Sequence, residues 1–247
     1  MIDHPIVVAH YCLVKANISE FPVDLRGALG ALGYGCASFS ETAQRSNCQI
    51  EDIAAFVKSW DGGSIVTGGV ITIAYNEKRP TTRSHFTIVH ELGHHLLGHV
   101  DDRTKTYAQK ENEANDFARN FLAPPVAFEL WKSPNEEFRV RYSSWYFGIS
   151  HACVYNRIKH LAADIAVLKD AGLYAAQRER FEPYIRENPL GKQTGNKCVS
   201  TKSKSCGVYL APEIKKCPLC GSVTMEFLET LVRPLDEFAK QRRYPRF

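Results

Sequence analysis

Apolar residues recur at helical spacing through FTIVHELGHHLLGH, residues 86–99, and predict a helix that is buried over much of its circumference. The run VITIAYN, residues 70–76, follows two glycines and is rich in β-branched residues, so it predicts a short strand. An arginine-containing connection at residues 78–83 joins the two. We therefore expect a strand, a polar connection and a largely apolar helix, in which any buried charged group needs a partner.

A second apolar pattern of helical period lies in ENEANDFARNFLAPP, residues 111–125. Two acids stand at its start, and Pro124 and Pro125 end it. This pattern predicts a buried helix whose apolar positions are Ala114, Phe117, Ala118, Phe121 and Leu122.

Shorter elements are predicted before the strand. Residues 25–44, LRGALGALGYGCASFSETAQ, predict an amphipathic helix followed by a glycine-rich turn, and residues 50–60, IEDIAAFVKSW, predict another short helix. The glycines lack the following Lys-Ser/Thr of a phosphate-binding loop. Together the patterns favour an α+β fold with a small sheet beside the helix of residues 86–99.

Downstream, SSWYFGISHACVYNRIKHL at residues 143–161 resembles a helix-turn-helix unit, with a turn at Gly148 and a helix N-cap at Ser150. One predicted face carries Val154, Ile158 and Leu161, and the outward positions are His151, Tyr155, Arg157 and Lys159. The same pattern arises in a nucleic-acid recognition helix and in a packing unit of a larger domain, and we favour packing. Residues 164–190 predict a charged helical segment interrupted by Pro183 and Pro189.

The candidate chemistry lies in the first helix. His90 and His94 are four residues apart and point the same way, so both rings can bind one metal ion while Glu91 reaches the reacting water. Two histidines do not complete a catalytic zinc site, which takes three protein ligands. Projecting the second helix at about 100° per residue puts Glu111 on its Ala118 face, so we favour Glu111 as third ligand, with Glu113 in reserve.

His99 does not match the third histidine of the extended zinc motif. That motif requires glycine at 97 and histidine at 100, where this chain has Leu97 and Val100. A continuing helix would also turn His99 about 180° from His90. His99 and Tyr107 are instead kept as alternative stabilisers of the transition-state oxyanion, and Asn115 as a residue that orients a ligand.

Three segments resemble the ImmA/IrrE family of metallo-endopeptidases over residues 60–165: residues 71–99, residues 111–125 and the helical segment that ends in RIKHL. The chain departs from the family at the end of the second segment, where it has Asn120-Phe121-Leu122-Ala123-Pro124 and the family usually has Leu-Leu-Met-Pro. The resemblance implies a zincin-like, gluzincin-type core in which His90, His94 and an acid hold zinc and Glu91 is the general base. It also implies a helix-turn-helix transcriptional repressor as substrate. The alternative is a regulator that binds DNA or protein without proteolysis and uses the same fold as a scaffold.

Composition agrees with a folded cytoplasmic protein. Hydrophobic residues make up 44% of the 247 positions, enough for a substantial core, yet no apolar run approaches the roughly 18 residues of a membrane span. The N-terminal segment lacks a basic region followed by a long apolar core, so we expect neither a signal peptide nor a membrane partner.

The eight cysteines fall into two groups. Cys12, Cys36, Cys48 and Cys153 stand among apolar neighbours and are predicted to be buried thiols. Cys198, Cys206, Cys217 and Cys220 cluster near the end, where KKCPLCG has the form of a zinc knuckle, and predict a structural zinc ion beside the catalytic one.

The net charge of the C-terminal region that holds the four clustered cysteines differs from that of the rest of the chain. Residues 191–247 hold 11 Lys/Arg and 5 Asp/Glu, a net charge of +6, whereas residues 1–190 carry a net charge of −2. Such a tail either contacts nucleic acid or keeps the protein in solution. We therefore predict a metallopeptidase domain at residues 1–130, a helical extension at 131–190 and a basic four-cysteine, zinc-ribbon-like domain at 191–247.

Overall fold

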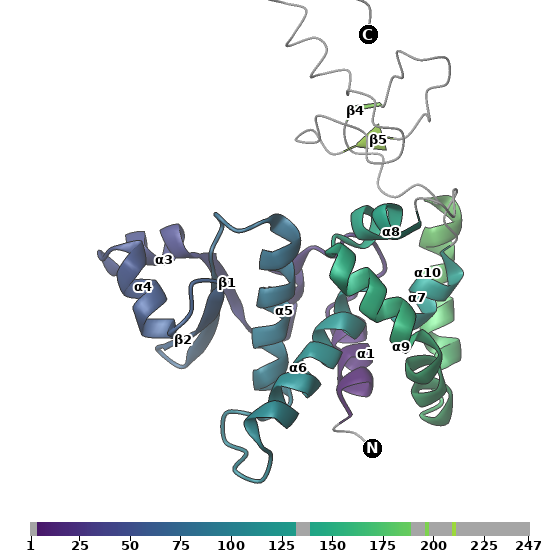
Figure 1. The fold of residues 1–247 in the computed structure, drawn as a ribbon, viewed down its shortest axis with the longest axis horizontal. Helices are drawn as coiled ribbons and strands as arrows, with labels where there is room; N and C mark the ends of the chain where they lie inside the picture. Colours follow the sequence, from purple (N-terminus) through teal and green to yellow (C-terminus); the bar gives the residue numbers. More distant parts are fainter. Residues whose placement is uncertain (1–3, 132–138, 189–195, 198–208, 211–247) are drawn as a thin grey trace, which may run out of the picture.

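The computed structural model describes residues 4–131, 139–188, 196–197 and 209–210. Helices on one side of α5 and a small sheet on the other give the α+β architecture expected from the sequence (Figure 1). The elements are α1 Pro5–Lys15, α2 Leu25–Leu32, β1 Gly35–Ser38, α3 Phe39–Ser46, α4 Ile50–Val57, β2 Gly62–Thr67, β3 Val70–Tyr75, α5 Thr81–Leu96, α6 Tyr107–Leu122, α7 Pro125–Leu130, α8 Arg139–Phe147, α9 His151–Asp170, α10 Tyr174–Glu187, β4 Asn196–Lys197 and β5 Tyr209–Leu210.

The main sheet has the order β1-β3-β2, with β1 parallel and β2 antiparallel to β3. Gly68 and Gly69 join β2 to β3 with φ of +59° and +80°, which suits a two-residue hairpin turn that side chains with a Cβ rarely adopt. The sheet lies between α5 on one face and α3 and α4 on the other (Figure 1). It therefore sits directly beside the helix that carries the two histidines.

Gly62 and Gly63 let β2 pass close to helices on both faces. A Cβ at Gly62 would lie 2.8 Å from Thr87 Cγ2 of α5, and one at Gly63 would lie 2.7 Å from Val57 Cβ of α4. Contacts this short require the backbone or its neighbours to move, so glycine is needed at both positions. The start of β2 is thus held against α5.

The predicted helix at residues 111–125 corresponds to α6, which begins four residues earlier. Thr106 and Gln109 form a capping box at its first turn, and the helix ends at Leu122, two residues before Pro124. The five predicted core positions of α6 are all fully buried, which confirms the pattern. The N-terminal part adds α1 and β1, which the sequence reading did not anticipate.

One apolar core runs from α1 through α10. Phe21 packs against Phe147 and Phe181, with ring centroids 4.9 and 5.4 Å apart, and Trp131 stacks on Tyr142 at 5.2 Å. The boundary predicted at residue 130 lies between α7 and α8, and the core continues across it. The helices of residues 139–188 therefore share this core, and α9 and α10 pack on α7.

The turn at Gly148 and the Ser150 N-cap are confirmed, because Gly148 has a φ of +65° and Ser150 Oγ accepts a hydrogen bond from Cys153 N. The predicted orientation of α9 is wrong in two places. Arg157 is fully buried and Ile158 is exposed, so an arginine occupies the inner face. The predicted break at Pro183 is also wrong, because Pro183 lies inside α10.

Of the scattered cysteines, Cys12 is buried as predicted, whereas Cys36, Cys48 and Cys153 are only partly buried. Cys198, Cys206, Cys217 and Cys220 lie outside the described residues, as do Pro189 and the basic C-terminus. Among the helices that the structure describes, none is both long enough and apolar enough to cross a membrane.

Gly93 sets the distance between α5 and α6. A Cβ at this position would lie 2.9 Å from Cδ1 and 3.3 Å from Cγ of buried Phe117. We expect Gly93→Ala to lower the free energy of unfolding by about 1–3 kcal/mol, because overpacking outweighs the gain in helix propensity. Gly30→Ala in α2, where nothing lies within 4 Å, is the matched control and is expected to stabilise by up to about 1 kcal/mol. Urea unfolding of both variants tests the contrast, and equal effects would contradict it.

Candidate metal centre

Three side chains from two helices converge at the C-terminal half of α5. His90 Nε2 and His94 Nε2 lie 3.0 Å apart, and each is 3.3 Å from a carboxylate oxygen of Glu111 on α6. Within the described part of the chain, these three residues form the one group of His, Cys, Asp and Glu side chains spaced to hold a metal ion. The structure thus brings together the three residues that the sequence favoured as ligands.

Hydrogen bonding on the outer side of His90 fixes which nitrogen faces the cluster. His90 Nδ1 lies 3.1 Å from Asn115 Oδ1, and a carbonyl oxygen accepts only from a protonated nitrogen. Nε2 of the neutral ring therefore presents its lone pair toward Glu111. A role for Asn115 in orienting a ligand requires such a contact.

The donor set fits a zinc ion. Ligand atoms about 2.0–2.2 Å from zinc at tetrahedral angles lie about 3.3–3.6 Å apart, close to the observed separations of 3.0 and 3.3 Å. Two imidazole nitrogens that meet through their lone pairs repel one another, and a cation between them removes that repulsion. Two histidines and one carboxylate are also the ligand types of catalytic zinc sites.

Burial shifts the ionisation of this cluster. It lowers the pKa of His90, and burial together with nearby His90 lowers the pKa of His94 to about 4, so both rings are neutral and ready to bind metal near pH 7. Burial, reinforced by the negative charge of Glu111, raises the pKa of the Glu91 carboxyl to about 7. A carboxyl group with this pKa both accepts and releases a proton near neutral pH.

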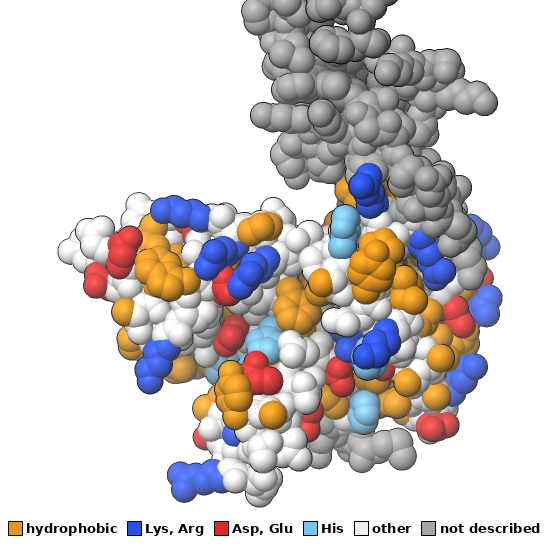
Figure 2. All heavy atoms as spheres, in the orientation of Figure 1, with side chains coloured by type: hydrophobic (Ala, Val, Ile, Leu, Met, Phe, Trp, Pro, Cys, Tyr) orange, Lys and Arg blue, Asp and Glu red, His pale blue; other side chains and the backbone are white. Residues whose placement is uncertain are grey.

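Two cavities meet beside the cluster. A cavity of about 490 Å³ is lined by His90, Glu91 and the start of β2 at Gly62, and another of about 630 Å³ lies between α6 and α9. Both are lined by Phe86, Asn115 and Cys153, so they adjoin next to His90. Figure 2 shows histidine and acidic side chains together at the surface in the hollow between the sheet side and the helical side.

Residues 40–159 match the family model Peptidase_M78, the IrrE N-terminal-like domain. The chain contains a domain of this family. The match begins at α3 and ends within α9, so it includes both metal-site helices and the sheet. Membership in Peptidase_M78 confirms the family expected from the motifs and makes the chain a metallopeptidase-type protein, with zinc as the implied metal. No curated protein matches the chain.

The remaining candidate residues of the Peptidase_M78 domain lie around this centre. Glu113 does not face the cluster, because its carboxylate contacts His99 Nε2 at 2.9 Å and Lys105 Nζ at 2.7 Å. His99 contacts the outer nitrogen of His94, since α5 ends at Leu96 and Gly98 reverses the chain with a φ of +69°. Tyr107 is exposed at the first residue of α6.

Sequence reasoning missed the residues that line the approach to the Peptidase_M78 site. Asp61 pairs with Arg83 at 2.5 Å, and both line the first cavity with Gly62. The available signal is the Asp61-Gly62-Gly63 run, because Gly62 and Gly63 begin a strand that needs small residues on both faces.

Proposed function

We propose that this protein is a zinc-dependent endopeptidase in which His90, His94 and Glu111 hold the metal and Glu91 is the general base. The observation that carries the proposal is the position of Glu91, which lines an open cavity together with metal-facing His90 and has a pKa near 7. A scaffold site needs the three ligands but has no use for such a base.

The residues divide the chemistry between them. Zinc, when bound, supplies a Lewis acid that polarises the scissile carbonyl and lowers the pKa of water. Glu91 accepts a proton from the attacking water and delivers it to the leaving amine. Asn115 holds the His90 ring in the tautomer that leaves Nε2 free for the metal. Tyr107 remains the candidate for stabilising the oxyanion, because both ring nitrogens of buried His99 are engaged, one by His94 and the other by Glu113.

A polypeptide has a path to this centre along β2. In the described sheet β2 is an outer strand, so its second edge has no strand partner, and its first residue lines the cavity that contains Glu91. Backbone groups at a free edge bind an extended peptide as an added strand. The proposed substrate is therefore a protein segment rather than a small molecule.

We further propose that the substrate is a helix-turn-helix transcriptional repressor in the cytoplasm, which the family resemblance supports. Co-expression with a helix-turn-helix repressor tests the proposal. A defined repressor fragment made by the wild type and absent with Glu91→Gln is the expected result. If neither the wild type nor Glu91→Gln yields a fragment, although zinc is bound and the protein associates with the repressor, the proteolytic role is wrong. The non-proteolytic regulator then replaces it.

A second zinc ion is proposed for Cys198, Cys206, Cys217 and Cys220. Wild-type protein is then expected to contain two zinc ions per chain, because the two ligand sets share no residue. Glu111→Ala and the double variant Cys217→Ser with Cys220→Ser are each expected to lose one ion, and exposed Asp101→Ala to lose none. Elemental analysis of the purified proteins measures this, and a wild type with one ion that the cysteine variant retains would rule out the structural site.

A further inference from the structure

A line of polar side chains continues from the metal cluster through the outer nitrogen of His94. His94 Nδ1 lies 3.0 Å from His99 Nδ1, and His99 Nε2 lies 2.9 Å from Glu113 Oε2. Lys105 Nζ contacts the same oxygen at 2.7 Å. His99 is almost completely buried, with 2% of its side chain exposed, so each of its nitrogens depends on these partners.

One arrangement of protons satisfies every contact when His94 binds a cation. His94 Nε2 faces His90 and Glu111 and must offer a lone pair, so the neutral ring carries its proton on Nδ1. That proton is donated to His99 Nδ1. Neutral His99 then carries its own proton on Nε2 and donates it to Glu113, whose oxygen also accepts from Lys105.

The loop between α5 and α6 is built to hold His99 in this position. Gly98 reverses the chain after α5, and His99 N donates to His94 O at 2.9 Å. Lys110 of α6 donates to the carbonyl oxygens of His99 and Asp102. Because Lys110, Glu111 and Glu113 all belong to α6, this helix provides one ligand directly and fixes a second one through His99.

We propose that His99 is a positioning residue that orients His94 for zinc, and that Glu113 and Lys105 fix His99. The inference deepens the proposed function, since it assumes that the cluster binds zinc, but it does not depend on peptide cleavage. It gives a role to Glu113, whose position in the sequence had made it a reserve ligand.

The experiment is a competition titration of the full-length protein with zinc and a chromophoric chelator. Glu111→Ala identifies the binding step that belongs to this centre. His99→Phe keeps an aromatic ring but removes both hydrogen bonds, and is expected to weaken that step by about 10–100-fold, as loss of an outer-shell partner does. His99→Gln can accept from His94 and donate to Glu113, so it is expected to restore most of the affinity.

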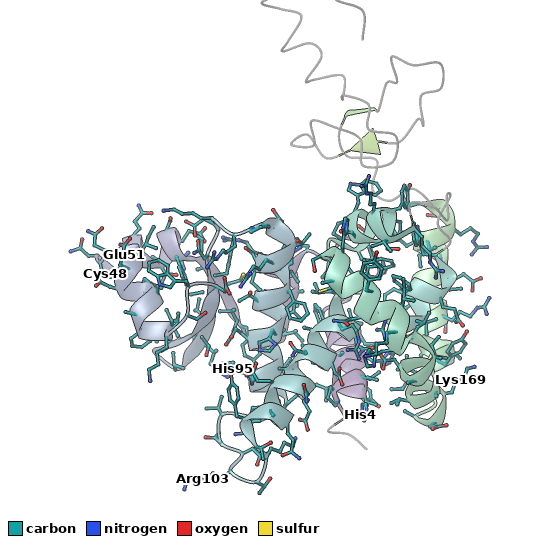
Figure 3. All side chains as sticks on the ribbon, in the orientation of Figure 1. His4, Cys48, Glu51, His95, Arg103 and Lys169 are labelled. Carbon is teal, nitrogen blue, oxygen red and sulfur yellow. The ribbon has the colours of Figure 1, made fainter. Side chains whose placement is uncertain are left out.

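The neighbouring histidine provides the matched control. His95 lies on α5 with its ring centroid 6.1 Å from that of Tyr34, outside the cluster (Figure 3). His95→Phe is expected to bind zinc as the wild type does. Lys105→Met is expected to weaken zinc binding less than His99→Phe does. Arg103→Met is its control and should bind zinc as the wild type does, because the Arg103 side chain points away from the protein on the loop that joins α5 to α6 (Figure 3).

Two further results separate positioning from a general effect on folding. Glu113→Leu, at a partly exposed site, is expected to weaken zinc binding less than His99→Phe, and the double variant no more than His99→Phe alone, because both act through one line of contacts. The absorption spectrum of the cobalt-substituted protein should shift in His99→Phe and return toward wild type in His99→Gln.

Unchanged zinc affinity in His99→Phe, or equal losses in the Phe and Gln variants with the fold intact by circular dichroism, would overturn the inference. A protein that binds zinc in this His99-dependent way but cleaves nothing would leave the inference standing and remove the endopeptidase proposal. The two failures are therefore distinguishable.

Discussion

Replacing Glu91 with Gln is expected to slow peptide cleavage by about 10²–10⁴-fold, the usual contribution of a positioned general base, while zinc stays bound. The amide keeps the size of the carboxyl group but cannot take the proton from water. Because Glu91 is absent from the group of residues spaced to bind the metal, its replacement leaves all three ligands in place. The loss should therefore appear in kcat with little change in the zinc content.

The measurement is the rate of appearance of a repressor fragment, with zinc content determined on the same samples. Asp101→Asn is the matched control, since it makes the same exchange of acid for amide at an exposed position of the α5–α6 loop and should cleave as the wild type does. A Glu91→Gln enzyme that cleaves at the wild-type rate would remove Glu91 from the mechanism.

Arg157→Met is expected to lower the free energy of unfolding by about 3–5 kcal/mol, because it leaves a buried carboxylate without its main charged partner. Arg157 is fully buried and contacts Asp164 of its own helix, Asn120 Oδ1 at 3.0 Å and Ala123 O at 3.2 Å. Burial lowers the pKa of the guanidinium, and the carboxylate of Asp164 opposes this. Methionine fills much of the volume but leaves Asp164 with Arg119, at 3.2 Å, as its one charged partner among the described residues.

Urea denaturation followed by circular dichroism measures this effect. Lys159→Met removes a long cation from the exposed side of the same helix and should change stability by no more than about 0.5 kcal/mol. A similar midpoint of urea unfolding for the two variants would show that the contacts of Arg157 with Asn120 and Ala123 do not join α9 to the end of α6. A large loss confined to Arg157→Met supports this connection, which also fixes the helix that carries Glu111.

The metal centre was predictable because its residues obey helical geometry. His90 and His94 are one turn apart, and the projection of α6 correctly separated Glu111, which contacts both histidines, from Glu113, which does not. The predicted position of His99, about 180° from His90, holds only for a helix that continues past residue 96. The helix instead ends at Leu96 and Gly98 turns the chain back, which a projection cannot anticipate.

The errors in α9 and α10 have a common physical cause. Sequence patterns assign apolar residues to the interior and charged residues to the surface. Arg157 is nevertheless buried, because Asp164, Asn120 and the carbonyl oxygen of Ala123 accept hydrogen bonds from its two terminal nitrogens. Pro183 costs a helix about 3 kcal/mol. Phe181 and Ile185 are buried on either side of it, and each contributes a comparable amount through burial, so tertiary packing keeps α10 continuous.

The outer edge of β2 in the described sheet would limit where the proposed peptidase can act. A segment that pairs with β2 must first leave whatever helix or sheet it occupies, so the rate of cleavage includes the free energy needed to open the substrate locally. Two substrates with the same residues around the bond will then differ in rate if one of them is folded more tightly there. Anything that stabilises the cut region of a repressor, such as dimerisation or operator binding, would protect it without touching the enzyme.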